Sequence, residues 1–210
     1  MILISCTLQK TLSDPSITPE NLPSFEGMVP ALPGLVARVL KNYIHVPYPI
    51  RSRPNALNED EVDELVEHID KIVQTFTDIS IQSGLLEGRG SDDQMPYVHV
   101  KLQVVTSDGC QFWHQDCVPF RLLSTLRGPC TEWVSPTFSR ATLERRQFDS
   151  DHAKSMDVGD VAIFKGRGVE EAVKIYGQDG IVHRSPRLGQ TGKNRLVLIV
   201  DIPQEGWHFD

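Results

Sequence analysis

The sequence has no long uninterrupted apolar run, no excess of basic residues and no paired-cysteine motif. No apolar run approaches the roughly 18 residues that a membrane-spanning helix needs, so we expect no membrane-embedded segment. Lys and Arg total 21 against 28 Asp and Glu, a net charge of −7, which argues against nucleic acid or an anionic lipid surface as a partner. The opening residues, MILISC, are too short for a signal peptide and lack its basic flank, so we expect a cytoplasmic protein.

The four cysteines, Cys6, Cys110, Cys117 and Cys130, show no C-x-x-C spacing. This absence argues against a structural zinc knuckle. Without a secretory signal they are also better interpreted as free thiols than as a disulfide framework.

Proline and glycine divide the 210 residues into two regions, and the total length suits a single domain. Eight of the 14 prolines lie before residue 55, and 13 of the 15 glycines lie after residue 80. Residues 1–30 show no hydrophobic period and carry four prolines, which predicts an extended N-terminal arm. We expect residues 31–210 to form one domain, with a helical buttress at about 31–80 and a β core at about 95–202.

The clearest helix is expected from about Glu59 to Asp78, where apolar residues recur at steps of three and one along a single stripe. Asn58 can cap this helix, with Glu61 in the reciprocal capping position. A shorter helix is expected after Pro33. The apolar stripe requires a partner surface, and the downstream sheet is the obvious candidate.

Downstream of residue 95 the hydrophobic period changes from 3.6 to 2, most clearly in YVHVKLQVV at 97–105. Turn signals separate further short apolar segments, which we expect to be strands at 111–116, 120–127, 131–134, 160–165, 180–185 and 195–201. The pattern predicts a mainly β fold, a sandwich or small barrel, buttressed by α-helices.

Three residues in this β region form a candidate metal site. His114 and Asp116 lie two apart on an expected strand, so their side chains project from the same face. His183, in a later strand, supplies a third ligand, and two histidines with one carboxylate are typical of non-haem Fe(II) oxygenases. Arg195 opens the last strand, where its guanidinium can clamp a carboxylate of a co-substrate such as 2-oxoglutarate.

Each of these residues also has an ordinary structural interpretation. His114 and Asp116 can be a surface pair joined by a hydrogen bond, and His183 a satisfied, half-buried histidine. Arg195 can pair with Asp201 or Glu132 instead of a ligand. Ser185, directly before Pro186, can simply shape a turn.

The segments FWHQD, VPFRLL, RGPCTEW, GDVAIFKG, VHRSP and RLVLIVD occur in this order between residues 95 and 202. Together they resemble the double-stranded β-helix of Fe(II)/2-oxoglutarate-dependent dioxygenases. The pattern is more closely similar to an uncharacterised domain-of-unknown-function family with FH-x-D, RGPGTEW, KG and HRSP motifs.

The resemblance implies a cupin-like jelly roll with His114, Asp116 and His183 as catalytic iron ligands. It implies that Arg195 anchors 2-oxoglutarate, and that Ser185 can hydrogen-bond the same co-substrate carboxylate.

The expected activity is therefore oxidation of a C–H bond of a small molecule or a peptide side chain, with Fe(II), 2-oxoglutarate and O2. A cupin-type metalloenzyme that does not use 2-oxoglutarate, a zinc hydrolase and a non-catalytic metal-binding or metal-homeostasis protein remain open alternatives.

Overall fold

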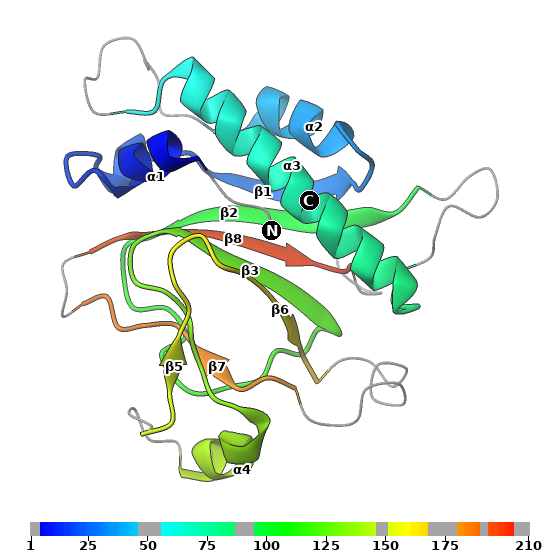
Figure 1. Cartoon of the computed structure of the whole chain (residues 1–210), viewed down its shortest axis with the longest axis vertical. Coiled ribbons are helices and arrows are strands. Elements are labelled where there is room, and N and C mark those ends of the chain that lie inside the picture. The colour runs from blue at the N-terminus through cyan, green and yellow to red at the C-terminus, as the bar shows by residue number, and fades with distance from the viewer. Residues whose placement is uncertain are drawn as a thin grey trace.

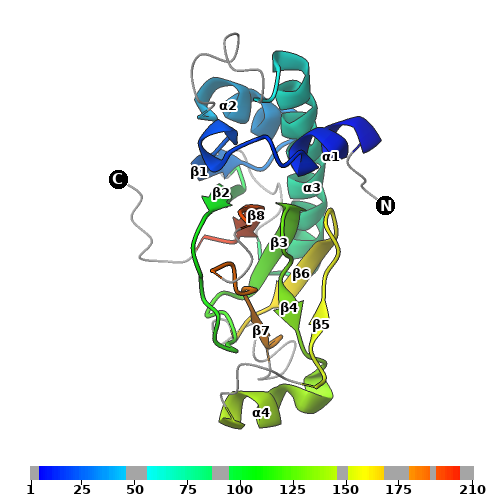
Figure 2. The same ribbon diagram turned by 90° about the vertical axis from the view of Figure 1, so that its left-hand side faces the viewer.

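The computed structural model describes residues 5–45, 56–86, 95–145, 151–167, 180–189 and 193–203. Helices α1, α2 and α3 lie over one face of a five-stranded antiparallel sheet, and a smaller three-stranded sheet lies on the other side (Figures 1 and 2). A further helix, α4, lies beyond the smaller sheet, at the opposite end of the molecule from the helical layer.

The large sheet has the strand order β1-β2-β8-β3-β6, and every neighbouring pair is antiparallel. Its strands are β1 (Phe25–Pro30), β2 (Tyr97–Val105), β3 (Phe120–Arg127), β6 (Val161–Lys165) and β8 (Arg195–Asp201). The small sheet has the order β5-β4-β7, formed by β4 (Glu132–Trp133), β5 (Lys154–Ser155) and β7 (His183–Arg184).

From β2 onward the chain alternates between the two sheets. It passes from β2 to a bridge of His114 with His183 beside β7, then to β3, to β4 and β5, to β6, to β7 and finally to β8. Two facing antiparallel sheets that exchange strands in this way form a jelly roll. The mainly β fold with buttressing helices, and the double-stranded β-helix, are therefore confirmed.

The helices are α1 (Cys6–Ser13), α2 (Leu35–Tyr43), α3 (Glu59–Gln82), α4 (Pro136–Arg145) and a 3₁₀ turn at Pro19–Asn21. In α3 the expected capping box is present, because Asn58 accepts from the Glu61 backbone and Glu61 accepts from the Asn58 backbone. The helix continues to Gln82, four residues beyond the expected end at Asp78. Among the described residues, no helix combines the length and apolarity that a membrane crossing requires.

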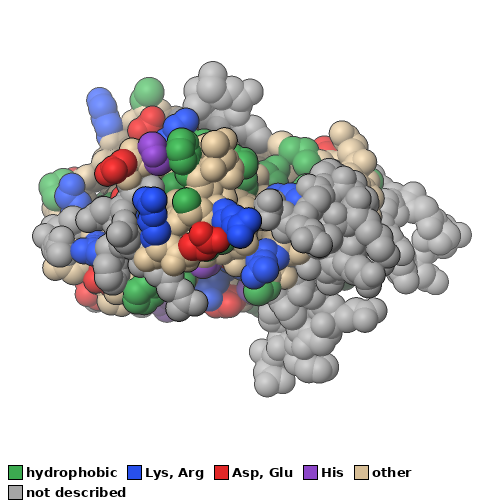
Figure 3. All heavy atoms as spheres, turned by 90° about the horizontal axis from the view of Figure 1, so that it is seen from below, with side chains coloured by type: hydrophobic (Ala, Val, Ile, Leu, Met, Phe, Trp, Pro, Cys, Tyr) green, Lys and Arg blue, Asp and Glu red, His purple; other side chains and the backbone are tan. Residues whose placement is uncertain are grey.

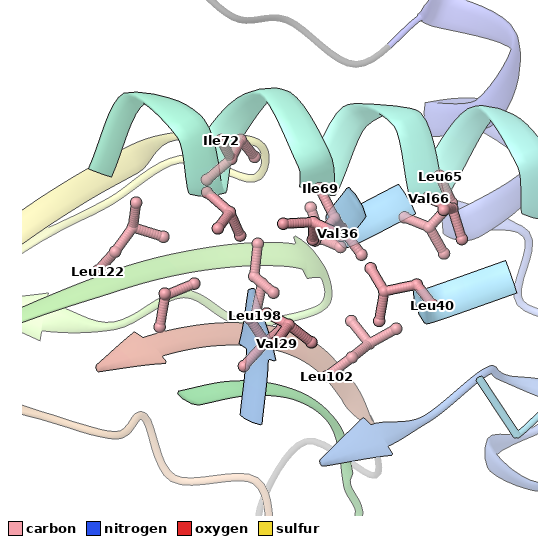
Figure 4. Packing of buried hydrophobic residues seen from close by; sticks show 14 of the residues in the cluster. Val29, Val36, Leu40, Leu65, Val66, Ile69, Ile72, Leu102, Leu122 and Leu198 are labelled. Carbon is pink, nitrogen blue, oxygen red and sulfur yellow. The ribbon is translucent and has the colours of Figure 1, made fainter. Parts of the chain in front are cut away.

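Alternation along the strands gives the large sheet two different faces. One face is apolar and packs against α2 and α3, as Figure 4 shows for Leu102, Leu122 and Leu198 beneath Ile69 and Ile72. The opposite face looks toward the small sheet and carries polar groups that line a cavity. The strand register therefore places apolar side chains on the face that packs against the helices and polar side chains on the face that lines the cavity.

The N-terminal segment differs from the extended arm that its prolines suggested. Residues 6–13 form α1, whose Leu8 and Leu12 are fully buried, and residues 25–30 form β1, which pairs along its whole length with β2. Arg127 of β3 also donates to the carbonyl of Ile17 at 2.8 Å. These contacts join the segment to distant parts of the chain, which is why a local hydrophobic period did not reveal them.

Two further elements lacked a clear sequence signal. Helix α4 is short and polar, and its buried residues are Ser139 and Thr142. Strand β5 has two exposed residues and pairs only with β4. The expected strand at 111–116 is reduced to the single bridge at His114, and β7 is shorter than the expected 180–185.

Candidate metal centre

His114 and His183 are held side by side by the backbone of the small sheet. Each backbone N–H donates to the carbonyl of the other residue at 3.0 Å, a reciprocal antiparallel pair. The two imidazole centroids consequently lie 4.5 Å apart. Asp116, two residues after His114, brings its carboxylate to the same place.

The ligand atoms of these three side chains converge. One atom from each of His114, Asp116 and His183 lies within 4.8 Å of the others, the spacing of a metal-binding cluster. His183 Nε2 is 3.3 Å from Asp116 Oδ2, and His114 Nε2 is 3.9 Å from Asp116 Oδ1. The three residues predicted as one site from sequence do lie together.

The other ring nitrogen of each histidine faces a backbone carbonyl. His114 Nδ1 lies 2.8 Å from the Phe112 carbonyl, and His183 Nδ1 lies 3.1 Å from the Ile181 carbonyl. Because a carbonyl can only accept, both contacts favour the tautomer with its proton on Nδ1. That tautomer leaves an Nε2 lone pair on each ring, directed at the cluster, as in metal-ligating histidines.

Burial further suits the cluster to a cation. Asp116 and His183 are buried, and burial holds the pKa of His183 below its usual value, so its ring is neutral near pH 7. Asp116 Oδ2 is buried and has no hydrogen-bond partner among the described residues, an arrangement that costs free energy unless another group binds it. Two free Nε2 lone pairs and an unpartnered carboxylate oxygen fit a divalent metal ion.

The cluster borders a cavity of about 240 Å³ between the two sheets. His114 and His183 form part of its wall, while Val105, Leu123 and Ile199 contribute apolar surface from the large sheet. His114 is partly exposed, so the cluster is accessible from solvent on that side. The volume suits a small metabolite rather than a drug-sized ligand.

Arg195 lines the same cavity and is buried without a carboxylate partner among the described residues. Its Nη2 donates to the hydroxyls of Thr125 and Thr131 at 3.2 and 3.1 Å. Burial lowers the pKa of Arg195 to about 10, a sign that its charge is poorly compensated.

The alternative ion pairs considered from sequence for Arg195 do not form. Asp201 is bound by Arg121, and Glu132 is bound by Arg184 at 2.6 Å. Arg195 is therefore a buried cation whose neighbours are hydroxyls, which suits an anionic ligand.

Ser185 also lines this cavity, beyond the end of β7. Its backbone N–H donates to the Cys110 carbonyl at 2.9 Å, which joins the loop after β7 to the loop after β2. Asp108 strengthens this connection, because its carboxylate accepts from the backbones of Leu188 and Gly189. Ser185 thus lies where a ligand can reach it, and a contact with a co-substrate stays a prediction.

Sequence reasoning did not assign Arg121, which contacts the cluster directly. Arg121 Nη1 donates to Asp116 Oδ1 at 2.6 Å, and its Nε and Nη2 donate to the two oxygens of Asp201 at 2.8 Å. Strand alternation allowed either face for Arg121, and only the pairing of β3 with β8 decides between them.

The cysteines and the other histidines that the structure describes are not part of the cluster. None of the four cysteines forms a disulfide, and Cys110 Sγ lies 3.5 Å from His114 Nδ1. His152 stacks on Phe138 beside α4, and His208 lies outside the described residues.

Acidic and basic side chains intermingle on the described part of the molecular face in Figure 3.

A family profile described as "Protein of unknown function (DUF1826)" matches residues 51–201, most of the chain and all of the candidate centre. The chain belongs to the DUF1826 family. The matched range begins after β1 and ends at the last residue of β8, so it covers the jelly roll from β2 onward and α3. No curated protein is similar enough to this DUF1826 chain to match it.

Solved structures with similar topology are distant from this DUF1826 protein. Dioxygenase for auxin oxidation 1 from Arabidopsis thaliana, in a complex with 2-oxoglutarate, is 13% identical with a TM-score of 0.47, covering 95% of this chain and 78% of that one. The rice dioxygenase for auxin oxidation is 14% identical with a TM-score of 0.43, covering 94% and 63%. Truncated Neurospora crassa T7H is 14% identical with a TM-score of 0.42, covering 97% and 70%. Similarities this low do not transfer an activity.

Proposed function

We propose that this protein is a non-haem Fe(II)- and 2-oxoglutarate-dependent oxygenase that oxidises a C–H bond of a small molecule or a peptide side chain. The observation that carries the proposal is the content of a single cavity wall. His114 and His183, whose ligand atoms converge with those of Asp116, line it together with Arg195, a buried guanidinium that has no carboxylate partner among the described residues.

His114, Asp116 and His183 would hold the metal through two Nε2 atoms and Asp116 Oδ2. Two histidines and one carboxylate are the protein ligands typical of non-haem Fe(II) oxygenases, and such a set would leave positions on the metal for other ligands. Bound Fe(II) would supply the redox chemistry that activates O2 with 2-oxoglutarate as the reductant.

Arg195 would bind the carboxylate of 2-oxoglutarate that lies away from the metal. Its hydrogen bonds to Thr125 and Thr131 fix the guanidinium, so little side-chain freedom is lost when an anion binds. Bidentate pairing with a planar carboxylate suits a guanidinium better than an ammonium group.

The charges in the interior also support a dianionic co-substrate. Asp116 and Asp201 contribute one negative charge each, and Arg121, which pairs with both, contributes one positive charge. A divalent metal and Arg195 would then leave the interior with two net positive charges, which the two carboxylates of 2-oxoglutarate neutralise. Buried charges require compensation of this kind.

The other cavity residues would position the ligand and limit access of water. Val105, Leu123, Val197 and Ile199 supply apolar surface to the cavity that His183 and Arg195 also line. A dry interior strengthens the electrostatic contacts that hold the co-substrate and protects reactive species from solvent.

The test is succinate release from 2-oxoglutarate by protein that is purified anaerobically and loaded with Fe(II). We expect Fe(II)- and O2-dependent succinate formation, which His114→Ala abolishes together with metal binding. Arg195→Ala is expected to abolish turnover and retain the metal. Arg140→Gln, which changes an exposed arginine on α4, is the matched control and should retain both properties.

Three outcomes would contradict the proposal. Tight zinc binding with no response to Fe(II) would favour a zinc enzyme. Metal binding without succinate release under any condition would favour a metal-binding protein or a metalloenzyme that does not use 2-oxoglutarate. Unchanged turnover in Arg195→Ala would show that the co-substrate anchor is wrongly assigned.

A further inference from the structure

Arg121 lies between two buried carboxylates at the edge of the candidate metal centre. Two of its nitrogens, Nε and Nη2, donate to Asp201 at 2.8 Å, one to each oxygen. Its remaining terminal nitrogen, Nη1, donates to Asp116 Oδ1 at 2.6 Å. All three donor nitrogens of the guanidinium are thus used, and each bond has a different acceptor oxygen.

The sheet register produces this arrangement. Arg121 of β3 and Asp201 of β8 are directly paired residues on neighbouring strands, so their side chains share the interior face of the large sheet. Asp116 approaches from the segment that leaves the small sheet just before β3. Arg121 is therefore fixed by the large sheet and reaches Asp116 on the segment that connects the two sheets.

We propose that Arg121, fixed by Asp201, is a positioning residue that commits Asp116 Oδ1 to a hydrogen bond and directs Asp116 Oδ2 alone to the metal. This inference rests on the proposed function, because it assigns a role to Arg121 in the metal site suggested there. It concerns how Asp116 binds and not which reaction follows.

The two oxygens of Asp116 are in different environments. Oδ1 accepts the charge-assisted bond from Arg121, whereas Oδ2 is buried, lies 3.3 Å from His183 Nε2 and has no hydrogen-bond partner in the part of the chain that the structure describes. A free carboxylate can bind a metal through one oxygen or both. With Oδ1 occupied, Asp116 binds through Oδ2 only, so it takes a single coordination position.

Asp201 is needed because a lone guanidinium beside the metal would repel the cation. Its two bonds to Arg121 pair the positive charge with a full negative charge on the side away from Asp116. The Asp201–Arg121 pair is close to neutral as a unit, so it can orient Asp116 without opposing metal binding. Partners of this kind, one shell outside the ligands, commonly tune metal affinity.

The experiment is a titration of the full-length, metal-free protein with Co(II), followed by calorimetry and by visible absorption. Co(II) is a spectroscopic probe whose absorption intensity and band positions report coordination number. Arg121→Gln is expected to weaken Co(II) binding by about 10- to 100-fold. It should also change the Co(II) spectrum, because both oxygens of Asp116 become available.

Arg127→Gln is the matched control. Arg127 lies on the same strand, is also buried, and donates to the Ile17 carbonyl with no contact to the triad. Its substitution should lower stability while the Co(II) affinity and spectrum stay those of the wild type. A loss of affinity that merely follows a loss of stability would appear in both variants and would overturn the inference.

Arg121→Lys tests whether the hydrogen-bond geometry of Arg121 matters in addition to its charge. It also replaces Arg121→Gln as the test variant if that protein fails to fold. Lysine keeps the positive charge, but its single ammonium group cannot replace the three bonds that Arg121 makes to the two oxygens of Asp201 and to Asp116 Oδ1. We expect Co(II) affinity at least about tenfold below that of the wild type, with an altered spectrum. A wild-type affinity and spectrum in Arg121→Lys would refute the positioning role.

Failure of this inference can be told apart from failure of the proposed metal site. If Asp116→Ala binds Co(II) as tightly as the wild type, the metal site itself is wrong. If Asp116→Ala loses Co(II) but Arg121→Gln keeps the wild-type affinity and spectrum, the metal site stands and only the positioning role of Arg121 falls.

Discussion

Replacing Arg195 by methionine should leave the ligand-free protein at least as stable as the wild type. Burial lowers the pKa of Arg195 to about 10, more than two pKa units below its usual value. At about 1.4 kcal/mol per pKa unit, keeping this side chain charged costs the folded state about 3 kcal/mol. Two hydrogen bonds to Thr125 and Thr131, at about 1 kcal/mol each, offset part of that cost. Methionine, of similar length, should therefore raise the free energy of unfolding by about 1 kcal/mol.

The pH at which wild type and Arg195→Met are compared follows from the lowered pKa of Arg195. Below about 10 Arg195 is charged in both the folded and unfolded states, so the full cost is present. This cost disappears only as the pH rises from the folded pKa of Arg195 toward its higher unfolded pKa. Urea unfolding at pH 7.5, followed by circular dichroism, therefore measures the whole effect.

Arg121→Met is the matched comparison, because Arg121 is a buried arginine with two carboxylate partners. Burial alone would lower its pKa, but Asp201 and Asp116 together raise it above the usual value. Removing its charge should cost about 3–5 kcal/mol, since two buried carboxylates lose their counter-ion. If Arg195→Met loses as much stability as Arg121→Met, Arg195 is a structural residue and its assignment as a ligand anchor is refuted.

Three further substitutions test other parts of the structure. Leu12→Ala should cost about 2–5 kcal/mol in urea unfolding, because Leu12 is fully buried, whereas a loose arm would lose almost nothing. Asn58→Ala should lower the free energy of unfolding by about 1 kcal/mol, because it removes the N-cap of α3. Asn58→Asp should retain most of the wild-type stability, because Asp is also a good N-cap residue. Hydrogen bonds from Gly189 and Leu188 lower the pKa of Asp108 below 3.8, so its stabilisation is present above that value and is lost as the pH falls through the folded pKa. The difference in melting temperature between wild type and Asp108→Asn should therefore shrink below pH 3.8, and a constant difference would contradict this role.

Elements with a strong local pattern could be predicted closely. Strands β3 and β8 begin and end at the expected residues, because turn signals bound both of these short, largely apolar segments. The cap and apolar stripe of α3 likewise depend on residues a few positions apart. The triad followed from the same reasoning, since strand spacing puts His114 and Asp116 on one face, and His183 lies on a later strand.

Elements stabilised by distant partners could not be predicted from local patterns. Strand β1 depends on pairing with β2, and α1 depends on burial of its leucines against β3 and α3. The role of Arg121 depends on the register between β3 and β8, and a shift of one residue would turn its side chain to the opposite face. Such information lies in contacts across the sheets rather than along the sequence.

The central claim is that one cavity holds both a metal and a dicarboxylate. It is tested most directly by anaerobic calorimetric titration of 2-oxoglutarate into the full-length protein, with and without Fe(II). We expect binding that requires Fe(II), that is lost in His183→Ala, and that weakens strongly in Arg195→Met while the metal is retained. Binding of equal strength without metal, or unchanged binding in Arg195→Met, would contradict the claim.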